Sequence, residues 1–154
     1  MTDYPAPAVI NNIRRNALKN IPVELENRYR IEGHEWGVMS SHFAVGSRHR
    51  FTRILAADCY WMPLQHANLV KSMLHFLTLE PEGRILACGG FHTGRANLAA
   101  FFDVAEEQGL EVEEIYEEDS AGVKREWKKE RDGGAENHTE RKRWLVIAML
   151  KRRS

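Results

Sequence analysis

The feature of this sequence that most limits the possible folds is a regular alternation of short apolar runs and longer amphipathic segments. The run 51–57 is short, apolar and closed by Asp58, which is typical of a strand buried on both faces. In the segment 63–79 that follows, apolar residues share one stripe of a helix, namely Leu69, Val70, Met73, Leu74 and Leu77. A second apolar strand, GRILACGGF, and a second helix over 93–109 continue the pattern. We therefore predict an α/β protein whose layered sheet has helices on both faces.

Weaker signals predict elements before this alternation. Apolar spacing indicates a helix over 6–19, with prolines near its start and basic residues near its end. The stretch LENRYRIE, 25–32, alternates weakly and predicts a short strand that leads into the loop GHEWG. Residues 38–50 show no periodicity and are predicted to form a loop. Thr93 is the expected N-cap of the helix over 93–109.

The last third of the chain predicts two more strands. LEVEEIYEED, 110–119, is a strand with its acidic residues directed outward, and WLVIAMLK, 144–151, is a buried strand. Between them lies the charged stretch 120–143, with Gly133 and Gly134 at its centre, which is typical of a long, solvated hairpin connection. A final strand reached by a hairpin must run antiparallel to its neighbour.

Length and charge exclude several classes of protein. The 154 residues make one domain, and 22 basic residues balance 22 acidic ones, so no net field draws the chain to nucleic acid or to an anionic membrane. No stretch has the length and apolar character of a signal or membrane segment. The two cysteines form no spaced framework, which favours free thiols in a reducing compartment. We expect a cytoplasmic or nuclear location.

Polar and aromatic side chains directly after the predicted strands are the candidate functional residues, because ligands of open α/β sheets bind beyond the carboxyl ends of strands. These positions are 33–37, 58–61 and 89–94. Asp58 either binds a ligand amine or hydroxyl, or has a structural role, in which it caps the helix near Pro63 or bonds nearby loop amides. Trp36 and Trp61 are either ligand platforms or, more commonly for tryptophan, packing residues.

The sequence gives little support for phosphate binding, metal binding, a cysteine nucleophile or nucleic-acid binding. GGFHTGRA, 89–96, has the glycine spacing of a phosphate loop, but Arg95 replaces the lysine and Ala96 lacks the hydroxyl that binds magnesium. No metal-ligand spacing occurs among the histidines and cysteines. Cys59, near His34 or His92, is more often a small apolar residue than a nucleophile. The basic patches 141–143 and 151–153 are typical of a solvated face.

Taken in order, these segments resemble a known family. TDYPAPAVINNIRRN, EGHEWG, RILAADCYWMPLQHANLVKSML, GGFHTGRANLAAFF and RKRWLVIAML resemble S-adenosylmethionine-dependent methyltransferases of the seven-strand class. The narrower resemblance is to the nicotinamide N-methyltransferase-like group, whose relatives include protein-lysine methyltransferases. The resemblance covers essentially the whole chain and implies a Rossmann-like sheet of strand order 3-2-1-4-5-7-6, with its last-threaded strand antiparallel. It implies S-adenosylmethionine as the cofactor and a small amine or a protein lysine as the methyl acceptor.

The resemblance also implies roles for particular residues. Asp3 would bond the ribose hydroxyls of the cofactor, which suits a carboxylate because it accepts two hydrogen bonds at once. Trp36 would pack near the adenine, and Ala56, Ala57 and Asp58 would lie beside the methionine part. The candidates on the acceptor side, for which catalytic roles are predicted, are Asp58, Tyr60 and Trp61. The family often has Asp-x-x-Tyr here, and Trp61 in the tyrosine position keeps an aromatic wall but lacks the hydroxyl.

In this family the first strand, its glycine-rich cofactor loop and the second strand precede the position of Asp3. We therefore expect the chain to begin about one-third of the way into the fold, to lack that loop and to bind the cofactor weakly or not at all. The apolar edge of the strand over 51–57 would then be unpaired and would favour self-association. Two functions follow: a methyltransferase, or a non-catalytic interaction module whose sheet is completed by another chain.

Overall fold

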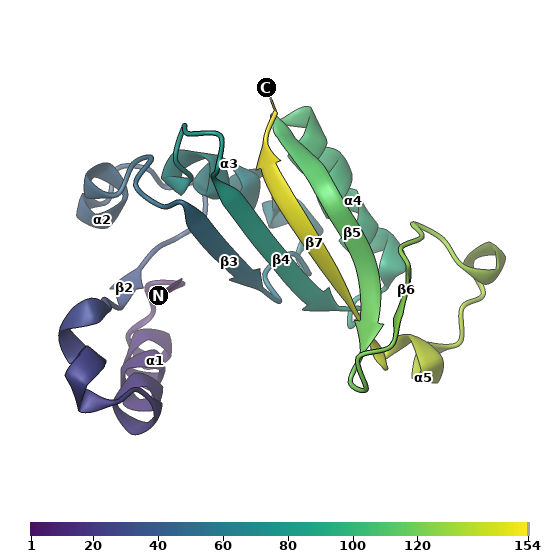
Figure 1. Ribbon diagram of the computed structural model, residues 1–154, viewed down its shortest axis with the longest axis horizontal. Helices are drawn as coiled ribbons and strands as arrows, with labels where there is room; N and C mark the ends of the chain where they lie inside the picture. The colour runs from purple at the N-terminus through teal and green to yellow at the C-terminus, as the bar shows by residue number, and fades with distance from the viewer. Residues whose placement is uncertain (154) are drawn as a thin grey trace.

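The computed structural model describes residues 1–153 and contains a mixed five-stranded sheet (Figure 1). Its strand order is β3 (Arg53–Ala57), β4 (Arg84–Gly90), β7 (Trp144–Arg152), β5 (Leu110–Asp119) and β6 (Lys124–Glu126). β3 and β4 are parallel, whereas β7 lies between β4 and β5 and is antiparallel to both. The predicted α/β class, the two apolar strands and the antiparallel final strand are confirmed. The order of the first four of these strands is also the 4-5-7-6 order that the resemblance implied.

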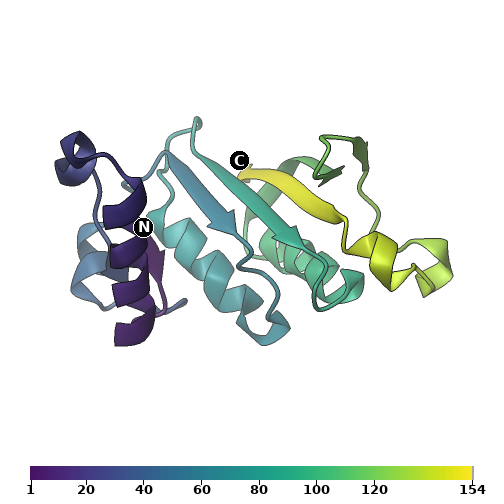
Figure 2. The ribbon, with the colours of Figure 1, turned by 90° about the horizontal axis from the view of Figure 1, so that it is seen from below.

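Two amphipathic helices cover one face of this sheet. The 3-10 turn η2 (Pro63–Gln65) leads into α3 (His66–Phe76), and α4 (Arg95–Glu107) follows β4. Both helices lie on the same side of the sheet (Figure 2). The core lies between them and the strands and includes Val70, Met73, Leu98, Phe101, Ile85, Ala87, Val146, Ala148 and Leu150.

The opposite face of the sheet differs from the prediction. Leu55, Leu86 and Leu145 are 67%, 36% and 47% exposed on that face. The expected helices on both faces are therefore present on one face only among residues 1–153. For the same reason β3 is not buried on both faces, since only Ala56 of this strand is fully buried.

β3 also forms the end of the sheet. The amide of Asp58 donates to the carbonyl of Cys88, and Arg84 donates to the carbonyl of Thr52. Because backbone groups alternate sides along a strand, the N–H and C=O groups of the odd-numbered residues, Leu55 among them, face the outer edge. That edge pairs with no strand of residues 1–153.

Residues 1–37, the N-terminal unit, contain a two-stranded sheet of their own, outside the main sheet. β1 (Thr2–Asp3) pairs in parallel with β2 (Glu32–Gly33), and α1 (Pro7–Asn20) and the 3-10 helix η1 (Val23–Arg28) lie between them in sequence. The predicted helix over 6–19 is confirmed. The predicted strand over 25–32 is wrong except at its last residue, because residues 23–28 form η1 and present no buried face.

Two local predictions were wrong for reasons of helix capping. Residues 38–50 contain a short helix, α2 (His42–Gly46), whose N-cap Ser41 accepts a hydrogen bond from the amide of Ala44 at 3.1 Å. Gly94, with φ +101°, and not Thr93, caps α4. The Thr93 hydroxyl instead donates to the carbonyl of Trp61 at 3.3 Å.

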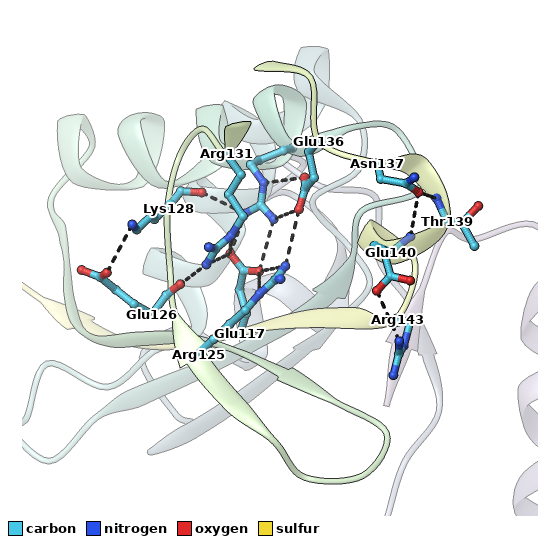
Figure 3. A network of polar contacts seen from close by, with 11 residues as sticks. Glu117, Arg125, Glu126, Lys128, Arg131, Glu136, Asn137, Thr139, Glu140 and Arg143 are labelled. Carbon is cyan, nitrogen blue, oxygen red and sulfur yellow. Dashed lines mark hydrogen bonds and ion pairs between the residues drawn. The ribbon is translucent and has the colours of Figure 1, made fainter. Parts of the chain in front are cut away.

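The charged stretch after β5 is folded, contrary to the prediction of a solvated hairpin. It contains β6, η3 (Asp132–Gly134) and α5 (His138–Arg141). Its charged side chains converge on β5 and on the start of α4 (Figure 3), forming a buried ion cluster of Arg95, Glu117, Arg125, Arg131 and Glu136. Glu117 has no exposed surface, so the acidic residues of β5 do not all point outward. Of the helices within residues 1–153, none combines the length and the apolar character needed to cross a membrane.

Candidate functional site

A cavity of about 590 Å³ lies between the N-terminal unit, β3 and α3. Its size falls within the range of small-molecule sites. The N-terminal unit contributes residues 2–4 and 34–36, β3 and the loop after it contribute residues 54–59, 61 and 62, and η2 and α3 contribute Gln65, Leu69, Ser72, Met73 and Phe76. The cavity reaches the carboxyl end of β3, where the sequence pattern placed the candidate residues.

Most of the predicted site residues meet at this cavity. Its lining includes six of them, from three separate segments of the chain: Asp3, Trp36, Ala56, Ala57, Asp58 and Trp61. Trp61 is 45% exposed and Asp58 has 55% of its side chain exposed, so both are accessible from solvent. The fold therefore brings the proposed cofactor residues and the proposed acceptor residues to one place.

Tyr60, predicted to lie on the acceptor side, is the exception, because it does not line the cavity. It is 1% exposed, its ring stacks on Phe101 with centroids 4.8 Å apart, and its hydroxyl lies 3.4 Å from the carbonyl of Val146. Burial raises the pKa of this phenol far above its usual value. Side chains alternate in direction around the turn after β3, so Tyr60 enters the core while Trp61 points outward.

The cavity carries negative charge. Three of its lining residues, Asp3, Glu35 and Asp58, are acidic, and no lysine or arginine of residues 1–153 lines it. Burial and, to a smaller extent, Asp3 and Asp58 raise the pKa of the Cys59 thiol to about 11. Cys59 is thus a neutral thiol and not an activated nucleophile. The charge and the aromatic walls suit a cationic ligand with an aromatic part.

Asp58 has a constrained geometry at the edge of the cavity. Its backbone is left-handed, with φ +51°, which is uncommon for any residue other than glycine. One carboxylate oxygen, Oδ1, accepts a hydrogen bond from the amide of Gly90 at 3.3 Å. The 3-10 turn at Pro63 has no side-chain cap, so the predicted helix cap by Asp58 is wrong. The other structural role predicted for Asp58, a bond to a nearby backbone amide, is present in its contact with Gly90.

Sequence analysis placed His34 among the candidate positions 33–37 but did not identify its partner Ser72 as a cavity residue. His34 is 4% exposed, and its Nε2 lies 2.9 Å from Ser72 Oγ, which also accepts a hydrogen bond from the amide of Gly37. Burial, and next the charge of His75, lower the pKa of His34, so the ring is neutral at pH 7. The available signal was a serine within the apolar stripe of α3, where a buried hydroxyl needs a partner.

Together the fold and the cavity define a Rossmann-like α/β protein with an acidic cavity at the carboxyl edge of its sheet. A solved structure of similar fold is the PH0226 protein from Pyrococcus horikoshii OT3, with a TM-score of 0.60 at 10% identity over 99% of this chain and 70% of that one. At this identity the likeness shows the fold alone.

The sequence comparisons relate the chain to methyltransferases. It is 29% identical over 125 residues to the "Protein N-terminal and lysine N-methyltransferase efm7" of Schizosaccharomyces pombe, covering 76% of this chain and 48% of that protein. The proteins of the same name from Emericella nidulans and Candida glabrata are each 28% identical, over 76% and 75% of this chain and 49% and 46% of their own lengths. The chain thus spans about half the length of the curated relatives it matches. No family model matches it.

Proposed function

We propose that this chain is part of an S-adenosylmethionine-dependent methyltransferase that acts on an amine nitrogen of a protein. The observation that carries the proposal is the acidic cavity, in which three carboxyl groups and two tryptophans surround a space of about 590 Å³. S-adenosylmethionine is a cation with an aromatic base, and a lysine or N-terminal ammonium is a cation as well. The names of the relatives support a protein acceptor over a small amine such as nicotinamide.

The residues around the cavity fit this cofactor. Asp3 is exposed and uses Oδ1 to accept a hydrogen bond from the Tyr4 amide at 2.6 Å, so Oδ2 is open to ribose hydroxyls. Trp36 offers a flat surface for the adenine, and the small side chains of Ala56 and Ala57 leave room beside β3. When bound, the cofactor supplies a methyl group on a sulfonium.

The chain's contribution to methyl transfer is mainly positioning. The reaction is an in-line displacement, so the acceptor nitrogen must be held close to the methyl carbon and must carry a free lone pair. Asp58 and Trp61 lie where they can hold an acceptor ammonium, by charge and by the face of the indole ring. Both side chains are about half exposed, which gives a protein acceptor access to them.

A nuclear magnetic resonance titration tests the proposal. Because no glycine lines the cavity within residues 1–153, we expect S-adenosylhomocysteine to bind with a dissociation constant of about 1 mM or weaker. The amide signals of Asp3, Trp36 and residues 56–58 should shift, and the size of these shifts should approach saturation as the ligand concentration rises. ATP, which carries the same adenosine but negative charge, is the matched control and should shift them less. An absence of shifts at the cavity with S-adenosylhomocysteine at 10 mM or so would reject the proposal.

The unpaired edge of β3 supports a second candidate function, as an interaction module that extends its sheet with a second copy of the chain. Leu55 is 67% exposed at this edge strand, and exposed apolar edge strands favour pairing between chains. Sedimentation equilibrium distinguishes the two functions, since a module of this kind should be dimeric at micromolar concentration.

Both cysteines are free, and a cytoplasmic or nuclear location stays a prediction.

A further inference from the structure

Two loops face each other at the carboxyl edge of the sheet, beside the cavity. Asp58 follows β3 and His92 follows β4, and these strands are parallel neighbours. Nε2 of His92 lies 3.8 Å from Oδ2 of Asp58. The side chains are 67% and 55% exposed, respectively, so the pair remains accessible to a ligand. The hydrogen bond from Thr93 to the Trp61 carbonyl ties the same two loops together.

The backbone conformation of Asp58 and the lack of a side chain at Gly90 allow Asp58 and His92 to lie close together. Asp58 adopts a left-handed backbone conformation, with φ +51°, which is uncommon for residues other than glycine. A Cβ atom at Gly90 would lie 2.8 Å from Nε2 of His92, so a larger residue at position 90 would displace the imidazole. Gly90 also donates its amide to Asp58 Oδ1, and one glycine thus positions both partners.

The residue before His92, Phe91, is packed in the core. Phe91 is 2% exposed, stacks on Trp127 with centroids 6.2 Å apart, and has the Arg95 guanidinium over its ring at 4.2 Å. Arg95 in turn donates hydrogen bonds to Glu117 and Glu136, the two carboxylates of the buried ion cluster that Figure 3 labels. His92 is therefore an exposed side chain on a rigid support.

We infer that His92, paired with Asp58, accepts the proton of the acceptor amine, an inference that rests on the proposed function. Among residues 1–153, Asp58 is the one ionisable group within ion-pair distance of His92. Nε2 is the ring nitrogen that lies 3.8 Å from this carboxylate, which leaves Nδ1 to accept a proton from a ligand. Sequence analysis placed His92 among the candidate positions 89–94 but assigned it no role in methyl transfer.

Methyl transfer to an amine begins with the loss of a proton from the acceptor ammonium. The acceptor ammonium transfers one proton to Nδ1 of His92, and the imidazolium is stabilised by Asp58. The freed lone pair on nitrogen forms the N–C bond as the S–C bond breaks, with the electron pair of that bond remaining on sulfur. His92 then releases its proton to solvent, to which it is exposed.

A titration of the free protein tests the amine site without cofactor. The probes are trialanine amide, which has an N-terminal amine, and Nα-acetyl-lysine amide, which has a side-chain amine; N-acetyl-trialanine amide is the uncharged control. We expect a saturable shift of the His92 Cε1–H signal with one or both amines and none with the control. Asp58→Asn and Gly90→Ala should each remove the shift, whereas His42→Gln, a change at an exposed histidine on α2, should not. If neither amine shifts the His92 signal, the inference fails.

A rate measurement tests the proton transfer itself. Methyl transfer to the preferred amine should fall about 100-fold or more in His92→Gln at pH 7. The loss should shrink at high pH, because α-amino groups lose their proton in solution near pH 8 and lysine near pH 10. A loss that is equal at all pH values, or no loss, overturns the proton-accepting role. If the unaltered chain transfers no methyl group, the proposed function fails, and the shift of the His92 signal alone then decides whether the amine site exists.

Discussion

The guanidinium of Arg95 donates to both carboxylate oxygens of Glu117, at 2.6 Å from Nη1 to Oε1 and 3.2 Å from Nη2 to Oε2. The two side chains are 6% and 0% exposed, and they join the start of α4 to the end of β5. Burial alone would raise the pKa of Glu117, but hydrogen bonds from Arg95 and Arg125 outweigh it and hold the pKa below its usual value. Glu117 is therefore ionised at neutral pH inside the protein.

Removing the charge of Glu117 should strongly destabilise the chain. Glu117→Gln removes the buried carboxylate that pairs with Arg95, Arg125 and Arg131, and breaking a buried ion pair costs about 3–5 kcal/mol. Lys129→Met is the matched control, because it removes the exposed pair with Asp103 from the same charged stretch. It should change the free energy of unfolding by less than about 1 kcal/mol. Urea unfolding measures both, and equal effects of the two variants would contradict a special role for the buried pair.

Stability should decrease as the pH falls. The pKa values of His34 and His66 are lowered, chiefly by burial, so their neutral forms are favoured in the folded state, and protonation of the unfolded chain near pH 6.5 begins to favour unfolding. The pKa values of Glu117 and Glu136 are also lowered, and their contribution is present above the ordinary glutamate pKa and is lost below it. Urea midpoints at pH 7, 5.5 and 4 should therefore decline stepwise. A midpoint that is constant between pH 7 and pH 5.5 would exclude the histidine contribution.

Arg152 should act as a cap for the carboxyl end of α3. Its guanidinium donates to the carbonyl oxygens of Leu77 at 2.8 Å and Thr78 at 3.0 Å, and it also reaches that of Leu74. Arg152→Ala should lower the free energy of unfolding by about 1–3 kcal/mol, because these carbonyls lose a charged donor. Thermal melts measure the effect, with Arg153→Ala, at the next position, as the control.

A proline substitution in β3 should show whether the chain self-associates through the outer edge of this strand. The N–H of Leu55 faces the outer edge of the sheet and bonds to no neighbouring strand, so Leu55→Pro removes a donor from that edge and none from the ladder with β4. Ala56→Pro, by contrast, removes a donor that faces β4 and should destabilise the fold. If the chain dimerises through this edge, Leu55→Pro should yield monomers in sedimentation equilibrium. A dimer that survives the change would place the contact elsewhere.

Asp3 should contribute to cofactor affinity through the ribose. Asp3→Ala should weaken binding of S-adenosylhomocysteine by roughly 1–3 kcal/mol, the value of a hydrogen bond to a charged group. Glu32→Ala, at the neighbouring strand β2 and not among the cavity residues, is the control. An unchanged affinity in Asp3→Ala would remove Asp3 from the ribose site.

The parts of the fold that were predicted correctly have strong local patterns. α3 and α4 show the helical stripe of apolar residues, and β4 and β7 are short apolar runs between turn signals. The predicted strand over 25–32 failed because its apolar residues, Leu25, Tyr29 and Ile31, are too few to form a buried face, and residues 23–28 form η1 with no buried residue. The position of most candidate site residues followed from one rule, that side chains after parallel strands meet at the same edge.

By itself, the sequence determined the elements, their alternation and the chemistry available at the strand ends, because these depend on residues near one another along the chain. Tertiary structure alone decided that Tyr60 enters the core while Trp61 lines the cavity, that Glu117 is buried with Arg95, and that His92 faces Asp58. Each of these relationships joins residues from separate elements. Their burial and ionisation depend on partners that local sequence patterns do not specify.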